Sequence, residues 1–319
     1  MWKTDETMLL PQLPEFALVV SSENSVSCRF SSESELVSIY IPTRNRPDFL
    51  RRAVASCLSQ SYQTFEVIIV DDCSDEAFRS EIEAVAAMDA RIKLYRLDTP
   101  SGACVARNAA ISAAQGRFIT GLDDDDEFLS WRLEHFVSEW RKWPVAAFLC
   151  SGYEVVTSKF AYCFGRKSAE LSPEELLMRN SVGNQLFTMT EYLRSIGGFD
   201  PAFRSCQDYD CWIRLSQVYG AGRRLASCSY RLRQDHQSER ISDSAERQQG
   251  YQLLLERYGN IMNGSQRRAQ KFYWYLNTQE WRSLRLLTLS GAGTFNVALK
   301  NIALRHFPCL ARFTWGGRR

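Results

Sequence analysis

The stretch FITGLDDDDE, from Phe118 to Glu127, is a short apolar run that stops at four consecutive aspartates. Four adjacent carboxylates repel one another, and an unpaired carboxylate is costly to bury. Mg2+ and Mn2+ prefer oxygen ligands and are commonly shared between protein carboxylates and substrate phosphates. A buried strand that ends in such a cluster therefore indicates a divalent cation and a phosphate. A solvated acidic turn is the alternative, and the cluster alone does not choose between them.

Strands and helices alternate from residue 36 up to this stretch. Apolar runs predict strands at 37–41, 65–70, 91–97 and 117–122, and helical spacing predicts helices at 49–58, from Ser74 or Asp75 to about Met88, and at 102–115. This alternation is typical of an α/β fold with a mainly parallel, Rossmann-like sheet sandwiched by helices. Ligands bind such sheets at the carboxyl ends of the strands. Pro42–Asn45, Asp71–Asp72 and Asp123–Asp126 all follow strands, so we expect them to converge.

The chain divides into three regions by composition. Residues 1–35 are an N-terminal extension rich in Ser and Glu, 36–243 form the α/β domain with halves at 36–126 and 127–243, and 244–319 form a helical basic region. In the second half, strands are predicted at 146–151, 186–190 and 226–232, and helices at 208–219 and after Ser172. From Ser244 the chain is predicted to be helical, with interruptions near Asn263–Gly264 and Gly291.

Composition and charge narrow the possible partners. With 319 residues, 45% hydrophobic and 12% aromatic, the chain is globular, and its net charge of +2 gives no support for nucleic-acid binding. The segment from Gln266 to the end nevertheless carries ten basic residues against one acid, Glu280. Such a basic, amphipathic region is typical of contact with a membrane surface or an acidic partner. The alternative is a terminal helical subdomain with a solvated basic face.

The cysteines and the apolar segments indicate a cytoplasmic protein. The ten cysteines are scattered, with no C-x-x-C pair, and free thiols in a reducing compartment explain them most simply. The apolar stretch 8–20 is broken by Pro11 and Pro14 and makes a poor signal peptide. No window reaches the roughly 18 apolar residues of a spanning helix. We therefore expect a cytoplasmic location, peripheral at the inner face of the plasma membrane if the basic region binds lipid.

Five ordered motifs carry a family resemblance that spans roughly residues 36–242. They are VSIYIPTRNR at 37–46, IIVDDCSDE at 68–76, SGACVARNAAISAAQGRFITGLDDDD at 101–126, GGFDPAFRSCQDYDCWIRL at 197–215 and YRLRQDHQSERIS at 230–242. In this order they resemble the inverting, GT-A-fold nucleotide-sugar glycosyltransferases of family 2. Cys73 stands where that family usually has glycine, and Gln207 where it more often has glutamate.

The resemblance implies a metal-dependent donor site. Asp125, the second acid of Asp123-x-Asp125, is the expected direct ligand of Mn2+ or Mg2+, and His236 is the expected imidazole ligand. Asp123 would bind the ribose or a metal-bound water. The register Asp124-x-Asp126 stays open, because spacing alone cannot separate it from Asp123-x-Asp125. Without the resemblance, a surface histidine in a polar stretch is the better interpretation of His236.

The remaining donor contacts come from the ends of the first two strands and from the third helix. Asp71 or Asp72, with Asp72 preferred, would accept from the imide N–H of uracil or thymine, and the backbone of Pro42, Thr43 and Arg44 would line the same base. Arg107 would pair with the diphosphate, because a guanidinium suits phosphate oxygens. Its alternative role is a structural salt bridge to one of the aspartates. The expected donor is a nucleotide-sugar, with a UDP-sugar preferred and a dTDP-sugar as second choice.

The catalytic base implied by the resemblance is Asp208, within Gln207-Asp208-Tyr209-Asp210. One positioned carboxylate is enough to take the proton of an acceptor hydroxyl. Asp210 would face elsewhere on a helix, and Trp212 is expected in the core rather than against a sugar. The expected reaction is a single displacement with inversion, onto a glycan or lipid-linked acceptor in the synthesis of a surface polysaccharide or lipopolysaccharide.

Two other functional classes compete with this one. A sugar-nucleotide nucleotidyltransferase would also use a parallel sheet, aspartates and a metal, but it usually needs a glycine-rich phosphate loop. The turn 43–47 contains no glycine, which argues against that class. A catalytically inactive GT-A scaffold is the second alternative, and the presence of Asp125, Asp208 and His236 together argues against it.

Overall fold

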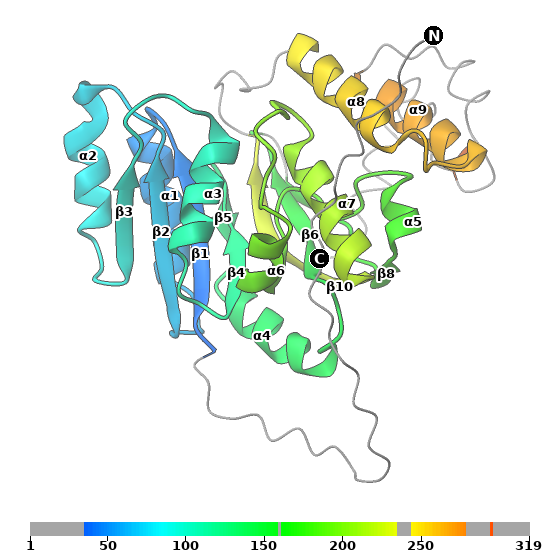
Figure 1. Cartoon of the computed structure of the whole chain (residues 1–319). Coiled ribbons are helices and arrows are strands. Elements are labelled where there is room, and N and C mark those ends of the chain that lie inside the picture. Colours follow the sequence, from blue (N-terminus) through cyan, green and yellow to red (C-terminus); the bar gives the residue numbers. More distant parts are fainter. Residues whose placement is uncertain (1–34, 159–160, 235–243, 279–293, 296–319) are drawn as a thin grey trace, which may run out of the picture. The chain divides into compact units, whose positions relative to one another are not determined.

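The computed structural model describes residues 35–158, 161–234, 244–278 and 294–295. Within them a ten-stranded sheet has the order β3-β2-β1-β4-β9-β6-β10-β5, with β7 paired to β6 and β8 paired to β10 (Figure 1). Helices cover both faces of this sheet, so the predicted α/β class is confirmed. The predictions for residues 1–34, for His236, and for the helical region at 279–293 and 296–319 with its interruption near Gly291 lie outside the described residues.

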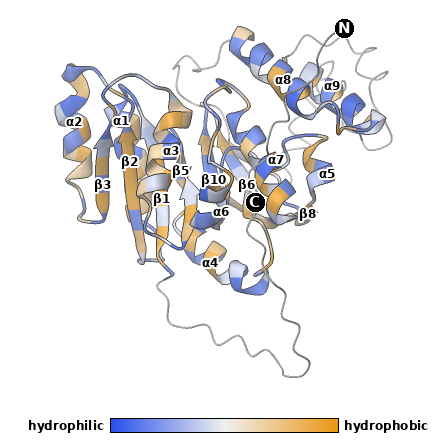
Figure 2. Ribbon diagram, viewed as in Figure 1, coloured by the Kyte–Doolittle hydropathy of each residue, from blue (hydrophilic) through white to orange (hydrophobic). Residues whose placement is uncertain are grey.

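The first half of the sheet follows the prediction closely. It comprises β1 (Val37–Thr43), α1 (Pro47–Leu58), β2 (Phe65–Asp71), α2 (Glu76–Ala86), β3 (Ile92–Arg96), α3 (Ala103–Ala113) and β4 (Phe118–Gly121). All pairings among these four strands are parallel. Figure 2 shows β2 as apolar along most of its length, and each of its residues is buried. A strand covered on both faces requires such a continuous apolar run.

The second half of the sheet is mixed. It comprises β5 (Glu127–Phe128), α4 (Arg132–Lys142), β6 (Leu149–Val156), β7 (Ala161–Phe164), β8 (Ala169–Leu171), α5 (Pro173–Leu176), β9 (Phe187–Met189), α6 (Thr190–Ser195), α7 (Gln207–Tyr219) and β10 (Gly222–Arg233). Strand β9 is antiparallel to both β4 and β6, and β6 is parallel to β10. Strands β6 and β10 therefore run in the same direction as β1 to β4, which makes the sheet mainly parallel.

Side chains that alternate along the strands build two cores. Ile39, Ile41 and Ile69 pack with α1, α2 and α4 on one face. Tyr40 and Ile68 face the opposite side and pack with α3, α6 and α7. Because neighbouring strand residues point to opposite faces, one apolar run supplies both cores. Figure 1 shows α3, α6 and α7 on the same side of the sheet.

Two helices follow the sheet, α8 (Ser244–Tyr258) and α9 (Gly264–Thr278), with the predicted interruption between them. They pack onto the sheet-covering helices. Arg257 of α8 pairs with Asp210 of α7 at 2.8 Å, and Gln270 of α9 donates to the Leu177 carbonyl after α5 at 2.8 Å. Phe272 of α9 is fully buried. No helix of the described residues is long and apolar enough to span a membrane.

Several elements differ from the sequence-based expectation. Strand β6 begins later than the predicted 146–151 segment and extends to Val156, and β10 begins at Gly222 rather than near Ala226. Helices α4 and α6 and the short strands β5, β7 and β8 were not predicted. Strands of two to four residues carry too little periodicity to be recognised, and Arg223 and Arg224 obscure the start of β10 because their side chains are polar.

Candidate active site

The polar clusters predicted at the strand ends lie side by side. The last pair of β1 and β2 is Thr43 opposite Asp71, and the Asp72 amide donates to the Thr43 carbonyl at 2.9 Å. Thr43 Oγ1 in turn donates to Asp124 Oδ2 at 2.9 Å. These contacts join the ends of β1, β2 and β4 at the carboxyl edge of the sheet. This is the edge at which open parallel sheets bind ligands.

The four aspartates alternate between buried and accessible positions. Asp124 is 7% exposed and Asp126 is 2% exposed. The side chains of Asp123 and Asp125 retain 23% and 27% of their accessible surface. Asp126 holds β10 in place, because it accepts from the Tyr230 hydroxyl at 2.8 Å and from the Arg233 amide at 2.9 Å. The run thus presents Asp123 and Asp125 to solvent and commits the other two to internal contacts.

The buried pair is electrostatically strained. Burial, with the neighbouring Asp125 charge, raises the pKa of Asp124 to about 7. Burial likewise raises the pKa of Asp126 well above its ordinary value. Arg46 offsets part of this charge, since its Nη1 lies 3.4 Å from Asp124 Oδ1 and 3.2 Å from Asp125 Oδ2. The Asp125 carbonyl also accepts from Arg52 Nη2 at 3.1 Å.

Asp123 is held by three donors. Arg107 Nη2 and Gln185 Nε2 each lie 3.0 Å from its Oδ1, and Asn184 Nδ2 lies 3.4 Å from its Oδ2. The Arg107 side chain is 10% exposed, and its guanidinium carbon lies 5.3 Å from the centroid of the Phe199 ring. Within the described part of the chain, its Nε and Nη1 have no hydrogen-bond partner. Arg107 therefore forms the salt bridge that was its alternative role, and it keeps two donors beside the aspartates.

Glycine at position 121 is required for the approach of Gln185. A Cβ at Gly121 would lie 2.0 Å from Gln185 Oε1 and 2.3 Å from the Tyr40 ring. In the structure Tyr40 donates its hydroxyl to Gln185 Oε1 at 2.9 Å, which turns the Gln185 amide nitrogen toward Asp123. The last residue of β4 thus makes room for the contact that orients the first aspartate.

Asp71 and Asp72 have separate structural partners. Asp71 accepts from the Ser74 amide at 2.9 Å and pairs with Arg96 at 3.2 Å, so it caps the turn after β2. Asp72 accepts from the amides of Ser101 and Gly102, at 2.7 and 2.9 Å, immediately before α3. Each carboxylate oxygen can accept more than one hydrogen bond, so these contacts leave room for a ligand donor.

Asp208 lies in the first turn of α7. Asn180 Nδ2 donates to its Oδ2 at 3.0 Å. Burial raises the pKa of Asp208 to about 6. Asn180 belongs to the same segment as Asn184 and Gln185, which we call the amide loop (Asn180–Gln185). One short loop therefore carries side-chain amides to Asp123 and to Asp208.

Asp210 and Trp212, two residues and one turn further along α7, are structural. Asp210 is fully buried and pairs with Arg214 and Arg257, both at 2.8 Å. The Trp212 ring is fully buried, as predicted, and its Nε1 donates to the Gly183 carbonyl at 2.9 Å. Asp208 is consequently the carboxylate of this segment that remains available for chemistry.

The structure places the remaining predicted residues with less detail. Arg44 is exposed and Pro42 is half-buried. Both precede Arg46, which contacts Asp124, by a few residues in the chain. His236 lies outside the described residues. Among the residues that the structure describes, no group of three histidine, cysteine or acidic side chains forms a ready metal site. The expected pair of Asp125 and His236 is not tested by that result, because one of its members is not described.

Five further residues belong to the site but were not predicted: Arg46, Arg52, Asn180, Asn184 and Gln185. Arg46 lies within the predicted turn 43–47, so its charge beside a strand end was a usable signal. The amides of the loop offered none, because Asn and Gln are common in turns and their partners lie up to 62 positions away.

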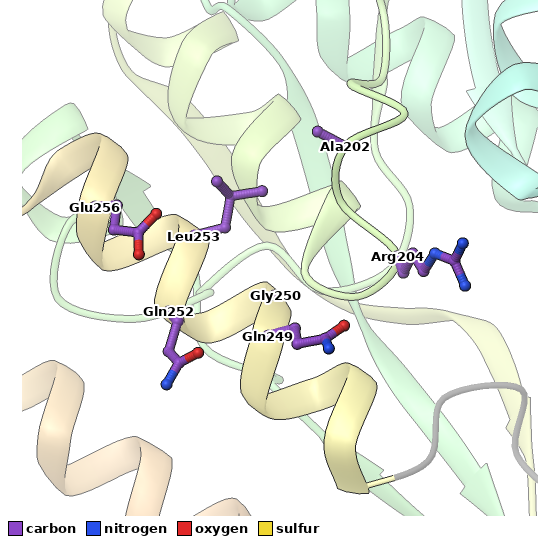
Figure 3. A pocket seen from close by; sticks show the side chains of 7 residues that line it. All are labelled: Ala202, Arg204, Gln249, Gly250, Gln252, Leu253 and Glu256. Carbon is purple, nitrogen blue, oxygen red and sulfur yellow. The ribbon is translucent and has the colours of Figure 1, made fainter.

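A separate cavity of about 280 Å3 lies between α8 and the segment before α7. Figure 3 shows Arg204 on that segment and Gln249 and Glu256 on α8. None of the predicted site residues lines this cavity.

Comparison with known proteins agrees with the motif order. The family model described as glycosyl transferase family 2 matches residues 38–196. The chain is 34% identical over 261 residues to WcaA of Escherichia coli K12, by name a colanic acid biosynthesis glycosyl transferase, covering 79% of this chain and 92% of WcaA. It is 32% identical over 211 residues to TuaG of Bacillus subtilis 168, by name a teichuronic acid biosynthesis glycosyltransferase, covering 62% of this chain and 79% of TuaG.

The fold is shared with solved structures. The crystal structure of residues 1–349 of S. aureus TarS in complex with UDP-GlcNAc aligns with a TM-score of 0.60 at 18% identity, covering 84% of this chain and 80% of that one. The corresponding UDP complex aligns with a TM-score of 0.55. These matches establish the GT-A fold. Because WcaA is aligned over nearly its whole length, the chain belongs to glycosyl transferase family 2 and is a glycosyltransferase.

Proposed function

We propose that this enzyme transfers a sugar, with inversion, from a UDP- or dTDP-sugar to a hydroxyl of a glycan or lipid-linked acceptor in the synthesis of a surface polysaccharide or lipopolysaccharide. The observation that carries the proposal is that one amide loop contacts both Asp123 and Asp208, while Asp125, two residues after Asp123, lies accessible beside Arg46 at the carboxyl edge of the sheet. The names of WcaA and TuaG support the polysaccharide class, and the TarS complexes support a UDP-sugar.

The donor would lie across the ends of β1, β2 and β4. The nucleotide base would rest on the backbone of residues 42–44, with its imide N–H donating to Asp72 or Asp71. Asp123 would accept from the ribose or from a metal-bound water. The Nε and Nη1 of Arg107, which have no partner among the described residues, would donate hydrogen bonds to diphosphate oxygens. Burying a guanidinium N–H without a partner costs free energy, and a hydrogen bond to an anionic ligand would offset that cost.

A divalent cation suits the residues at this edge. Asp125 offers carboxylate oxygens, which Mg2+ and Mn2+ prefer, and its side chain is among the more accessible of the four aspartates. The burial of Asp124 and Asp126 favours the Asp123-x-Asp125 register. Asp125 would hold the ion with His236. When bound, Mn2+ or Mg2+ would stabilise the negative charge of the departing diphosphate as a Lewis acid.

Asp208 would act as the general base. Its pKa of about 6 lets it be ionised at neutral pH and still be a stronger base than an ordinary aspartate. In the proposed step, Asp208 takes the proton of the acceptor hydroxyl while that oxygen attacks the anomeric carbon. The bond from the anomeric carbon to the diphosphate oxygen breaks on the opposite side. A single displacement of this kind inverts the anomeric configuration and requires no second nucleophile.

The acceptor would reach the enzyme at a membrane surface. The basic residues after Gln266 support contact with anionic lipid headgroups at the inner face of the plasma membrane. Arg267, Arg268 and Lys271 of α9 belong to this set, and all three are exposed.

The test is a screen of UDP- and dTDP-sugars for slow hydrolysis with Mn2+ or Mg2+, in the wild type and in Asp125→Ala and Asp208→Asn. Release of nucleoside diphosphate by the wild type, lost after chelation and in both variants, is the expected result. Release of pyrophosphate would instead identify a nucleotidyltransferase. A folded protein that neither binds nucleotide nor turns over any donor would identify an inactive scaffold.

A further inference from the structure

The amide of Asn180 has one orientation because its oxygen is already committed. Asn180 Oδ1 accepts from the amides of Val182 and Gly183, at 3.2 and 2.9 Å. A flipped amide would set its NH2 group against two N–H donors, so the nitrogen must point the other way. That nitrogen lies 3.0 Å from Asp208 Oδ2. The turn at 180–183 thus aims a donor at the carboxylate.

The backbone of the amide loop is fixed at three successive carbonyls. Arg224 of β10 donates to the Ser181 carbonyl at 3.2 Å, Tyr153 of β6 to the Val182 carbonyl at 2.9 Å, and Trp212 of α7 to the Gly183 carbonyl at 2.9 Å. Trp212 lies one helical turn after Asp208. The amide loop and α7 are therefore joined by two hydrogen bonds. Trp212 donates to the loop backbone at Gly183, and Asn180 donates to the Asp208 carboxylate.

The loop has no freedom to relax toward Tyr153. Gly183 has a φ of +95°, and a Cβ there would lie 1.0 Å from the Tyr153 hydroxyl oxygen. Glycine is therefore required at this position both by its backbone conformation and by the close approach of the tyrosine. A loop fixed in this way can hold a side chain to a defined geometry.

We propose that Asn180 is the positioning residue of Asp208: the amide donor, locked by the turn it forms, fixes one carboxylate oxygen and so sets the direction of the other. The inference rests on the proposed role of Asp208 as the base. A base must lie within hydrogen-bond reach of the proton that it takes, so the angle of the carboxylate determines the rate.

The donor also favours the ionised carboxylate against its surroundings. The Asn180 bond lowers the pKa of Asp208, whereas burial raises it. The titratable or charged groups that interact with Asp208 from the neighbouring elements are Arg107 and Cys104 of α3, Asp123 after β4, Tyr40 of β1, Tyr153 of β6, Cys206 before α7 and Cys211 of α7. Of these groups, Arg107 alone is positively charged and lowers the pKa of Asp208, whereas the negative charge of Asp123 raises it.

The experiment measures the Asp208 carboxyl directly, in the full chain and without a ligand. Protein labelled with 13C at the aspartate carboxyls is titrated by NMR, and the signal absent from Asp208→Asn is assigned to Asp208. In Asn180→Ala the midpoint of this signal should rise by about one unit, because a hydrogen bond to a charged group is lost. In Asn180→Asp, which keeps an acceptor for the turn, the like charge should raise it further.

Ser181→Ala is the matched control, since the Ser181 hydroxyl contacts Arg179 and Glu175 and not Asp208. Its titration should match the wild type. If Asn180→Ala lowers the melting temperature but leaves the Asp208 midpoint within about 0.2 units of the wild type, Asn180 is merely structural and the inference is wrong. In the donor screen, Asp208→Asn that retains turnover overturns the role of the base itself. If Asp208→Asn is inactive while Asn180→Ala and Asn180→Asp are both fully active, only the positioning role of Asn180 is overturned.

Discussion

Asp208 and Asp210 lie two residues apart on α7, and the structure gives them opposite roles. Asp210 is fully buried and accepts from Arg214 at 2.8 Å, from Arg257 at 2.8 Å and from the Tyr258 hydroxyl at 2.8 Å. These contacts connect α7 to α8. We expect Asp210→Asn to reduce stability strongly, because it leaves two partly buried arginines facing an uncharged amide.

The magnitude follows from the burial of the three partners. Breaking a buried ion pair on one side costs about 3–5 kcal/mol. The lower end applies here, because the Arg257 side chain is 33% exposed and an asparagine oxygen still accepts one hydrogen bond. A loss of about 3 kcal/mol corresponds to a melting temperature lower by about 6–12 °C for a domain of this size.

The assay is thermal unfolding at pH 7.5, followed by circular dichroism, of the wild type, Asp210→Asn, Asp208→Asn and Asp200→Asn. Asp200 pairs with the same Arg257 at 2.6 Å but is 28% exposed, so its variant is the matched control and should lose about 1 kcal/mol or less. Asp208→Asn should abolish donor turnover without lowering the melting temperature. If Asp210→Asn is as stable as Asp200→Asn, the buried ion pairs of Asp210 do not stabilise the packing of α8 on α7.

Further testable consequences concern Asp208, Gly183 and the C-terminal region. Since the pKa of Asp208 is about 6 and a base must be ionised, turnover should decrease as the pH falls below about 6. The raised pKa also means that the native state loses stability as pH rises from about 4 to about 6. Asp208→Asn should therefore have a higher melting temperature than the wild type at pH 8 and the same one at pH 4, and equal melting temperatures at both pH values would contradict this. Gly183→Ala should lose turnover and melt lower than Gly197→Ala, whose Cβ meets nothing within 4 Å, although both glycines have positive φ; similar melting of the two would refute the role of Tyr153. Removing residues 279–319 should leave nucleotide binding intact and weaken sedimentation with phosphatidylglycerol vesicles. Unchanged vesicle binding of this truncated protein would exclude the proposed membrane contact. Removing residues 264–319 should instead prevent folding, because the fully buried Phe272 is lost.

The parallel half of the fold was predictable because its residues report their environment directly. Val67 to Val70 are all apolar, since β2 is covered on both faces, and no other element explains such a run. Only the later part of strand β10 was predicted from the sequence. Arg223 and Arg224 stand at positions where a buried strand would have apolar residues, so they hid the start of the strand. The pattern of a half-exposed strand is intrinsically weaker.

The site was predictable to the level of residue type but not of contact. Sequence placed the Asp123–Asp126 run at a strand end, yet four identical residues cannot show which two are buried. The answer depends on Thr43, which contacts Asp124, and on Tyr230, which contacts Asp126; both are distant from the aspartates in sequence. Asn180 was missed for the same reason, because its partner Asp208 is 28 residues away and no spacing rule links them.

Strand β9 has a consequence for how the chain is made. Phe187–Met189 pairs with β4 on one side and, through Phe187, with Leu149 of β6 on the other. During synthesis β1 to β4 emerge first, and the outer edge of β4 has no partner until Phe187 follows. An unpaired strand edge invites pairing with another chain. We therefore expect a nascent or truncated polypeptide that ends before Phe187 to aggregate, because the exposed edge of β4 is covered only by three residues that are translated long after it.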